Sequence, residues 1–531
     1  GRTCRVQFAR QRCAHGIGAR VTPPPSTLVE LVDHAADRWP DQTMLLARQG
    51  DQCTYGEYRD RVAQMAAGLR DVGVGPGNIV SWILPTWVDT VVLAGALARL
   101  GAVQNPIITI YRDREVSFCC RQAGTSFLVT PGDFDGFDFA AMAERIQQDD
   151  PDLRTLTVGP NSFPTGDPTT LPPVVIPADD DVRWLTYTSG TTADPKGARH
   201  TDATVGAFPF AMGQRLDVQT GDRYSLTFPF PHIGGIGLLF MALQTGCTHL
   251  LDETVDPIAT IDFLSEHDCT HAGTGTPFYL MYLAAQDRRT AKGAGPLFPS
   301  LKVCPGGGAP IPPALHRRVV DELGGVGVCS GWGLTEAPVL TNGDVGDPDE
   351  KMANSEGRAL PGVDLIAVAG DGTRCPVGAE GELRAKGPQV MLGYVDPALD
   401  ADAFDADGYF RTGDLGVIDD DGYVTITGRL KDVIIRNGEN ISAKEIEDLL
   451  FSSDEVADVA VFGVPDERTG ERVVAAIVAS NGAKPNIGSI AAFLRDAGLR
   501  TQALPERVDI VDALPRSPAG KILKRELQEK D

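Results

Sequence analysis

The stretch TYTSGTTADPKGARH (residues 186–200) places two glycines, a lysine and a run of hydroxyl side chains in one short loop. The apolar residues of VRWLTYTS, just before it, predict a strand that runs into the loop. Gly190 would let the backbone turn with its amide groups facing an anion. Lys196 would add a positive charge. Further hydrogen bonds to the anion are expected from the hydroxyls of Ser189, Thr191 and Thr192. We therefore expect this loop to wrap a phosphate group.

A nucleotide-binding P-loop is the obvious alternative for this stretch. That motif reads GxxxxGK[ST], so its lysine follows a glycine and precedes a hydroxyl residue. Here Lys196 precedes Gly197, and no Ser or Thr follows the lysine directly. The P-loop interpretation is rejected, and a plain surface turn stays open until the other motifs are considered.

Length, composition and charge restrict the class of protein. The chain has 531 residues, too many for one compact core, so two or more domains are expected. Its 48 basic and 72 acidic residues give a net charge of −24, which argues against nucleic-acid partners and anionic membranes. No apolar run reaches the ~18 residues of a membrane span. The ten scattered cysteines have no zinc spacing and predict reduced core thiols in a cytoplasmic protein.

Local signals divide the chain into regions. Residues 1–26 form an arginine-rich arm that is either a transit peptide or a loosely docked segment. TLVE (27–30) and TYGE (54–57) are capping boxes that start helices, and SFLVTPGD reads as a short buried strand, so an α/β fold is expected. Short strands between Gly and Asp turns predict a small β unit at about 356–428. Residues 429–531 read as a separate small domain with one clear helix, SAKEIEDLLF (442–451).

Five segments resemble the ordered motifs of the adenylate-forming superfamily, which includes acyl-CoA synthetases, luciferases and peptide-synthetase adenylation domains. YTSGTTADPKG (187–197) resembles the phosphate loop, with Ala193 where the family usually has glycine. In chain order, the others are FPFPHIGG (228–235), GWGLTE (331–336), YFRTGDLG (409–416) with GRLKDVIIRNGENISAKEIE (428–447), and PRSPAGKILKREL (515–527). The resemblance implies a large N-terminal AMP-binding and acyl-binding domain (27–428), with two α/β layers and a small β-barrel-like unit. It also implies a small mobile α+β C-terminal domain (429–531).

The resemblance implies that the carboxylate of an acid attacks the α-phosphate of ATP, and that a thiol then displaces AMP. Glu336 would ligate Mg²⁺ together with Thr191, and Thr335 would donate to the α-phosphate. Asp414 would accept hydrogen bonds from the ribose hydroxyls. The remaining nucleotide-binding residues that the resemblance implies are Thr188, Ser189, Gly190, Thr192, Lys196, Gly308, Ala309, Pro310, Trp332, Gly333 and Arg429.

The C-terminal motifs supply a movable lysine and a thiol channel by the same resemblance. Lys521 would stand between the carboxylate and the α-phosphate, where a cation removes the repulsion between two anions. Lys431 matches the hinge about which the C-terminal domain turns. The pantetheine arm of CoA would pass along a channel lined by Gly438, Glu439 and Asn440.

The acid pocket is expected at PHIGGIGLLF, which His232 heads and which includes Gly234 and Gly235. No carboxylate lies in this stretch, so an amino acid, whose ammonium would be buried without a partner, is disfavoured. His232 is either a gate or hydrogen-bonding wall of the pocket, or a general base. We expect an acid with an uncharged tail, fatty, alicyclic or aromatic. CoA is the expected acceptor, with a separate carrier protein as the alternative.

Overall fold

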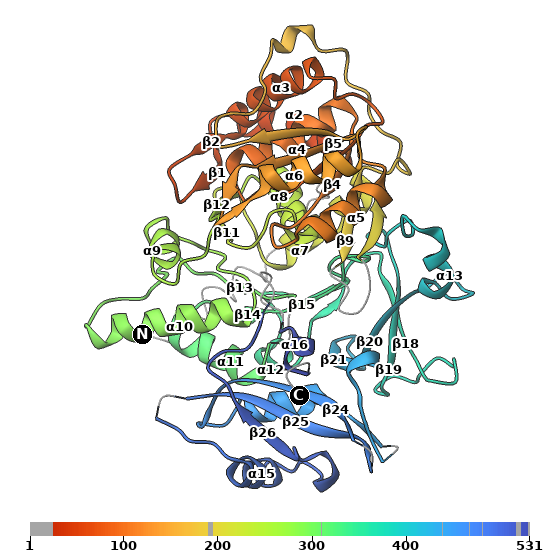
Figure 1. Ribbon diagram of the computed structural model, residues 1–531. Helices are drawn as coiled ribbons and strands as arrows, with labels where there is room; N and C mark the ends of the chain where they lie inside the picture. Colours follow the sequence, from red (N-terminus) through yellow and green to blue (C-terminus); the bar gives the residue numbers. More distant parts are fainter. Residues whose placement is uncertain are drawn as a thin grey trace.

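The computed structural model of the chain describes residues 25–188, 195–308, 311–437, 439–466, 468–480, 482–516 and 522–528. Figure 1 shows a large mixed α/β part that carries the N-terminal elements and a smaller C-terminal part built on its own sheet. The predicted α/β class is therefore confirmed. Among the described helices, none has both the length and the apolar character that a membrane span requires.

A six-stranded sheet carries the loop with which the sequence analysis began. Its order is β10-β9-β4-β3-β5-β8, and β9 and β10 form its one antiparallel pair among the described strands. Parallel strands joined by helices are the expected arrangement of an α/β layer. The strands are β3 (Ile79–Trp82), β4 (Val103–Pro106), β5 (Phe127–Pro131), β8 (Arg154–Val158), β9 (Trp184–Thr188) and β10 (Lys196–His200).

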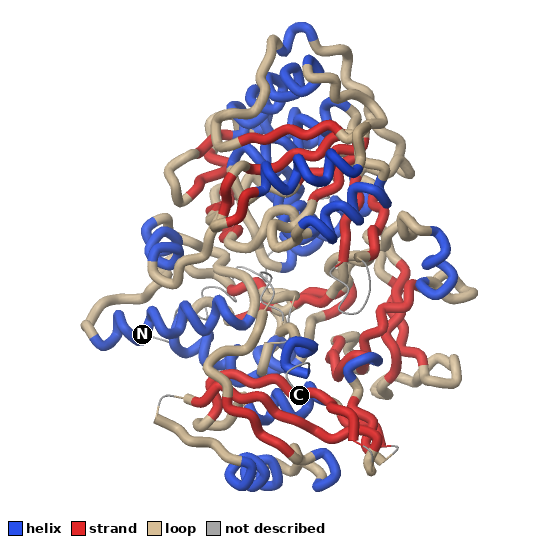
Figure 2. Tube along the Cα trace, viewed as in Figure 1, coloured by secondary structure: helices blue, strands red, loops and turns tan. Residues whose placement is uncertain are grey.

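A second sheet of four strands lies beside it, in the order β11-β12-β1-β2. One hydrophobic core joins apolar residues of both sheets to helices α2, α3, α4 and α8, and Figure 2 shows these helices gathered in the upper part of the molecule. The strands are β1 (Thr43–Ala47), β2 (Gln52–Thr54), β11 (Arg223–Leu226) and β12 (Thr248–Leu251). The helices of this part are α2 (Leu28–Arg38), α3 (Tyr55–Asp71), α4 (Val88–Leu100), α5 (Asp113–Ala123), α6 (Phe139–Asp149), α7 (Asp202–Arg215) and α8 (Ile233–Thr245).

The two predicted helix starts are present in this part, and Thr27 is the N-cap of α2, where its side chain accepts from the Glu30 amide. Thr54 and Glu57 form the complete capping box of α3. Gly101 ends α4 in the left-handed conformation, with φ of 72°, as a C-terminal glycine should. The eight described cysteines are all free, and seven of them are buried.

Shorter elements connect this part to the site. Helices α9 (Ala259–Glu266), α10 (Thr276–Ala291) and α11 (Pro313–Arg318) share a second hydrophobic core. Two small sheets lie next to it, and they hold the glycine-rich turns of the motifs. Their strands are β13 (Cys304–Pro305), β14 (Val328–Cys329), β15 (Gly331–Trp332), β16 (Thr341–Asn342) and β17 (Arg358–Ala359).

The expected small β unit is an antiparallel sheet in the order β18-β19-β20-β21. The described strands make an open sheet, so the barrel-like shape that we expected is wrong. The ladder ends with Asp414 opposite Arg429, and this register brings two motif residues together. The strands are β18 (Asp364–Val368), β19 (Gly381–Lys386), β20 (Phe410–Ile418) and β21 (Val424–Arg429), with α12 (Asp349–Asn354) before them and α13 (Asp400–Ala403) between β19 and β20.

The C-terminal part is a sheet with helices on both faces. Alternate residues of β24 point to opposite faces: Val459 and Val461 join the core under α14 and α15, while Ala460 and Phe462 join the core under α16. The strands are β22 (Ile434–Arg436), β23 (Glu439–Ile441), β24 (Val456–Asp466), β25 (Gly470–Ala479) and β26 (Arg507–Ile510). The helices are α14 (Ala443–Leu450), α15 (Ile487–Asp496) and α16 (Lys524–Gln528).

Candidate functional site

The two ends of the glycine loop lie side by side. Thr188, the last residue of β9, is paired with Lys196, the first residue of β10, and Gly197 is opposite Tyr187. A Cβ at Gly197 would come within 2.8 Å of the Tyr187 ring, so this position has no room for a side chain. The two strands that flank the loop thus form an antiparallel pair. The loop's predicted phosphate-binding residues Ser189, Gly190, Thr191 and Thr192 lie outside the described residues.

Trp332, Asp414 and Arg429 come from three different strands and meet at one point. The indole Nε1 of Trp332 donates a hydrogen bond of 2.8 Å to Oδ2 of Asp414, and Nε of Arg429 lies 2.8 Å from Oδ1. Asp414 and Trp332 are buried, and the Arg429 side chain is about one-third exposed. These residues are 82 and 15 positions apart in the sequence, and the fold brings their side chains into contact.

The glycines around this cluster are needed for close backbone contacts. A Cβ at Gly333 would lie 2.2 Å from the backbone nitrogen of Val339, so only glycine fits the turn after Trp332. Gly308 is exposed and has φ of 77°, a left-handed conformation that suits glycine. The neighbouring Ala309 and Pro310, which were predicted to face adenine, lie outside the described residues.

Thr335 and Glu336 are held by two residues that sequence reasoning did not single out. His200, at the end of β10, donates from Nε2 to the carbonyl oxygen of Thr335 at 2.9 Å, and its Nδ1 contacts the Thr204 hydroxyl at 3.0 Å. Burial lowers the pKa of His200 to about 4, so the ring stays neutral. The Tyr394 hydroxyl donates to Oε1 of Glu336 at 2.8 Å. Burial and the adjacent Glu336 carboxylate raise the pKa of Tyr394, so the hydroxyl keeps its proton.

His232 has a structural role that the sequence analysis did not predict. It is the N-cap of α8, and its Nδ1 accepts a hydrogen bond from the Gly234 amide at 3.1 Å. Burial lowers its pKa to about 4. A neutral ring whose Nδ1 is an acceptor carries its proton on Nε2. A Cβ at Gly235 would lie 2.6 Å from the Phe230 carbonyl oxygen, so this glycine is required for the tight entry into α8.

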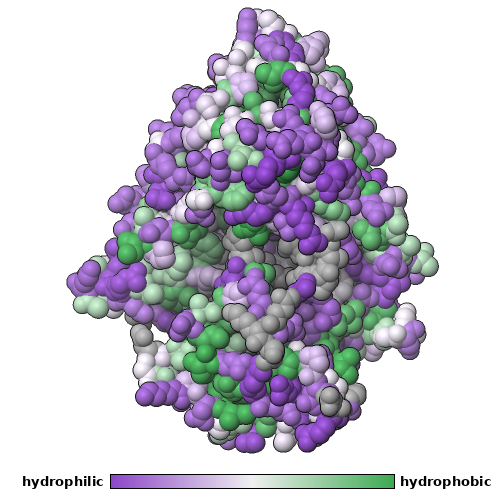
Figure 3. Space-filling view, in the orientation of Figure 1, coloured by the Kyte–Doolittle hydropathy of each residue, from purple (hydrophilic) through white to green (hydrophobic). Residues whose placement is uncertain are grey.

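A cavity of about 610 Å³ lies between the large part and the C-terminal part. Figure 3 shows the visible face hollowed at this level, with apolar residues beside the hollow on the C-terminal side. The large part contributes Gly308, Trp332, Gly333, Asp414 and Arg429 to the lining, and the C-terminal side contributes Lys431, Asn440, Lys444, Glu447, Arg500 and Lys524. Five of the expected nucleotide residues, the expected hinge residue Lys431 and one expected thiol-channel residue, Asn440, therefore border one space.

Of the residues expected in the thiol channel, Asn440 lines the C-terminal side of this cavity, and Glu439 precedes it in β23. Arg500 donates to the backbone oxygen of Asn440 at 2.6 Å and approaches the Glu439 carboxylate at 3.5 Å. Lys431 lies in a short 3₁₀ turn (Leu430–Asp432) that follows β21 directly. Gly438, between Asn437 and Glu439, lies outside the described residues.

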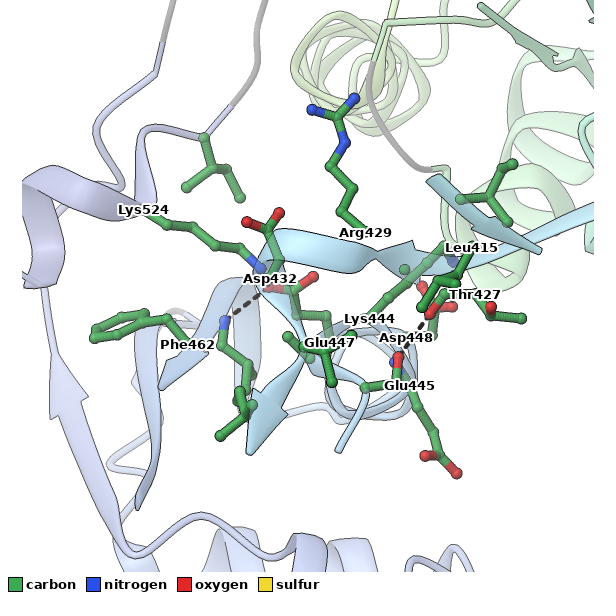
Figure 4. A pocket seen from close by; sticks show the side chains of 18 of the residues that line it. Leu415, Thr427, Arg429, Asp432, Lys444, Glu445, Glu447, Asp448, Phe462 and Lys524 are labelled. Atoms are coloured by element: carbon green, nitrogen blue, oxygen red, sulfur yellow. Dashed lines mark hydrogen bonds and ion pairs between the residues drawn. The ribbon is translucent and has the colours of Figure 1, made fainter. Parts of the chain in front are cut away.

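The segment around Lys521 is anchored on both sides, although Lys521 itself lies outside the described residues. Arg516 and Ile522 form an antiparallel bridge, and Arg516 pairs with Asp458 at 2.7 Å. On the other side, the Lys524 ammonium lies 2.8 Å from Oε1 of Glu447, and Figure 4 shows Lys524 reaching toward Glu447. Both contacts are made within the C-terminal part, so the described residues on either side of Lys521 are fastened to that part.

The residues present fit a magnesium ion that is bound together with nucleotide. Glu336 is 9% exposed, and the Tyr394 hydroxyl donates to its carboxylate. Among the described residues, no group of three or more His, Cys, Asp or Glu side chains can hold a metal by itself. Magnesium is often held by one or two carboxylates plus phosphate oxygens, which agrees with a single acidic ligand here. The second expected ligand, Thr191, lies outside the described residues.

Comparison with known proteins gives a consistent match along the chain. Residues 32–395 match the model of the AMP-binding enzyme family, and residues 445–521 match that of the AMP-binding enzyme C-terminal domain. The chain is 32% identical to a feruloyl-CoA synthase of Amycolatopsis sp, over 90% of this chain and 94% of that protein. It is 27% identical to a medium-chain fatty-acid–CoA ligase of Escherichia coli (strain K12), over 94% of this chain and 89% of that protein.

Solved structures extend the likeness to the arrangement of the parts. ATP-bound MatB from Rhodopseudomonas palustris superposes with a TM-score of 0.82 at 27% identity, and covers 95% of this chain and 99% of its own. The apo form of the same protein superposes with a TM-score of 0.74 over the same shares of both chains. The chain therefore resembles the ATP-bound form more closely than the apo form.

Proposed function

The chain belongs to the AMP-binding enzyme family, and we therefore propose that it is an ATP-dependent acyl-CoA synthetase of the AMP-forming type. It would join a carboxylic acid to ATP as an acyl-adenylate, release pyrophosphate, and then transfer the acyl group to the thiol of CoA with release of AMP. The observation that carries this proposal is the shared cavity, which Trp332, Asp414 and Arg429 border on one side and the C-terminal part borders on the other.

Each described residue has a distinct task in this reaction. Trp332 would lie against adenine while its indole N–H orients Asp414, and Asp414 would accept from the ribose hydroxyls. Thr335, whose carbonyl is held by His200, would donate to the α-phosphate. Glu336 would hold Mg²⁺, which supplies positive charge to the phosphates when bound. Preorganised donors and cations of this kind lower the barrier because the developing charge needs no rearrangement of water.

Lys521 would supply the cation that lets two anions approach, and Lys431 would be the hinge that removes it before the thiol arrives. The anchors of the 516–522 segment support this proposal, because a segment fastened to the C-terminal part must move with that part. Asn440 and Glu439 would then line the path of the pantetheine arm. Lys196 would contact the terminal phosphates of ATP from the end of β10.

The acid would have an uncharged tail, and it would bind beside the N-terminus of α8. His232 is neutral there, and its Nε2–H can donate to a ligand. The buried residues of α8 are all apolar or glycine. An ammonium group would find no carboxylate along this helix. The names of the two relatives given above, for a feruloyl and a medium-chain fatty acyl group, agree with uncharged tails of different shape.

A pyrophosphate-release screen over a panel of carboxylic acids tests the proposal. Release should require ATP, Mg²⁺ and an acid with an uncharged tail, and mass spectrometry should find the acyl-CoA thioester when CoA is added. If acyl-adenylate forms without the CoA thioester, and the acyl group is transferred to a phosphopantetheinylated carrier protein, the acceptor is the carrier protein and not CoA. Failure to form any acyl-adenylate across the panel would refute the proposed activity.

A further inference from the structure

Glu336 lies between two buried contacts that come from distant segments. On one side, His200 holds the carbonyl of the preceding Thr335. On the other, the Met391 amide donates to the Glu336 carbonyl at 2.8 Å, and the Tyr394 hydroxyl donates to the carboxylate. The backbone and the side chain of Glu336 are therefore fixed by the same short segment, 391–394.

The segment that holds Glu336 is attached to the strand that leaves the phosphate loop. Tyr394 forms an antiparallel bridge with Ala198 in β10, and the Val395 amide donates to the Gly197 carbonyl at 2.7 Å. The ring of Tyr394 also faces the loop lysine, because Nζ of Lys196 lies 5.5 Å from its centroid. One tyrosine thus contacts the lysine of the loop with its ring and the magnesium carboxylate with its hydroxyl.

This double contact has a chemical consequence for a metal–nucleotide complex. A free glutamate side chain loses rotamer entropy when it is fixed. The Tyr394 hydrogen bond fixes Oε1 in advance and leaves the lone pairs of Oε2 to ligate a cation. The ring holds the Lys196 ammonium by a cation–π contact. Lys196 and Glu336 have opposite charge, and Tyr394 contacts the first with its ring and the second with its hydroxyl.

We propose that Tyr394 is a positioning residue that prepares Glu336 to bind Mg²⁺ and couples that carboxylate to the lysine of the phosphate loop. The inference rests on the proposed function, because it requires that ATP binds here as its magnesium complex. Tyr394 is also part of a hydrophobic core with Trp332 and Met391. If Tyr394 only stabilised this core, its hydroxyl would not affect how ATP binding depends on Mg²⁺. The Mg²⁺ dependence of ATP binding therefore distinguishes a positioning role from a purely structural one.

The test measures ATP binding to the full chain by titration calorimetry, first in EDTA and then over a series of Mg²⁺ concentrations. Tyr394→Phe keeps the ring and removes the hydroxyl. We expect its Kd for ATP in EDTA to match that of the wild type. With Mg²⁺ present, its Kd should be weaker by about tenfold, because the metal must then fix a Glu336 side chain that is free to change rotamer. The Mg²⁺ concentration that gives half of the maximal increase in ATP affinity should also be higher for Tyr394→Phe than for the wild type.

Tyr423→Phe is the matched control. The Tyr423 hydroxyl donates to the Asp347 carboxylate at 2.7 Å, and Lys351 lies over its ring at 4.8 Å. Tyr423 therefore contacts a carboxylate and a lysine, as Tyr394 does, but these residues do not line the cavity. Tyr423→Phe should leave the Mg²⁺ dependence of ATP binding unchanged, and urea unfolding of both variants reports any general loss of stability.

A double-mutant cycle with Glu336→Gln gives a second measurement. Once the carboxylate is replaced, Tyr394→Phe should have no further effect on the Mg²⁺ dependence of ATP binding. Equal Mg²⁺ dependence in the wild type and Tyr394→Phe overturns the positioning role while the proposed function stands. If Mg²⁺ does not change ATP binding to the wild type, the proposed function and this inference are both wrong.

Discussion

The Asp414 carboxylate has more acceptor sites than its protein partners occupy, and the ribose hydroxyls of ATP could use those that remain. Each carboxylate oxygen has one partner among the described side chains: Oδ2 accepts from the Trp332 indole, and Oδ1 pairs with Nε of Arg429. An ionised carboxylate offers about four acceptor sites. Two sites therefore remain, one on each oxygen, and they equal the number of hydroxyls on the ribose of ATP. This count predicts that both hydroxyls are needed for full affinity.

Asp414→Asn changes this count while it keeps the shape of the side chain. The amide oxygen can still accept from the buried Trp332 indole, and its second lone pair can accept from one ribose hydroxyl. The amide nitrogen is then directed at Arg429 and the other hydroxyl, where it is a donor instead of an acceptor. Both remaining contacts also lose the charge of the carboxylate.

The magnitude follows from these losses. A hydrogen bond to a charged group contributes about 1.5–3 kcal/mol, so ATP should bind Asp414→Asn roughly ten- to a hundredfold more weakly. The loss of unfolding free energy should be smaller, about 1 kcal/mol, because the Arg429 side chain is about one-third exposed and solvent screens its charge. Binding and stability should therefore change by different amounts.

Titration calorimetry with ATP, 2′-deoxy-ATP and 3′-deoxy-ATP checks the prediction. The wild type should bind each deoxynucleotide about tenfold more weakly than ATP, and Asp414→Asn should discriminate less between them. Asp347→Asn is the control, because the Asp347 carboxylate is buried and also accepts from an aromatic hydroxyl and an arginine, Tyr423 and Arg358. Equal affinity of the wild type for all three nucleotides would refute the assignment of Asp414 to the ribose.

Three further predictions concern the C-terminal lysines and one buried histidine. Lys521→Ala should block acyl-adenylate formation and largely spare thioester formation from supplied acyl-adenylate, with the exposed Lys484→Ala as control; loss or retention of both half-reactions would contradict this. Lys431→Pro should slow thioester formation more than adenylation, because proline fixes φ at the expected hinge, and equal slowing in rapid-quench assays would argue against a hinge there. Burial lowers the pKa of His200 from 6.5 to about 4, so the unfolded chain takes up a proton first as the pH falls below 6.5. The unfolding free energy in urea should then fall by up to about 1.4 kcal/mol per pH unit between pH 6.5 and 4, and His200→Gln should remove this part of the slope.

Local sequence signals predicted most of the fold around the site. The strand before the glycine loop is β9, the capping box at Thr54 starts α3, and the helix expected in SAKEIEDLLF is α14. Such signals depend on neighbouring residues only, so they can be read without the tertiary structure. The open form of the sheet from β18 to β21 could not be predicted, because closure depends on how the edge strands twist relative to each other.

The residues that support the site carry no local signal. Tyr394 acts 58 positions from Glu336, and His200 acts 135 positions from Thr335. Their neighbours in the sequence look like an ordinary turn and an ordinary strand end. His232 was expected in the pocket wall, and its capping contact with Gly234 became visible only with the backbone of α8 in place. A pattern can therefore identify residues that contact a substrate more readily than those that hold them.

The position of the proposed hinge relative to the proposed ribose site explains how movement of the C-terminal domain could leave the nucleotide site intact. Arg429 is the last residue of β21 and is paired with Asp414 in the β20–β21 ladder, so it is part of the fixed sheet. Lys431 lies only two residues further on, in the turn that leaves this ladder. A rotation about Lys431, as proposed here, would keep the Trp332, Asp414 and Arg429 cluster unchanged and would carry away everything fastened to β24 and α14, including the anchors of the Lys521 segment. The cation needed for adenylation would then depart while the adenylate stays bound, and the side of the cavity that it leaves would be open to the thiol.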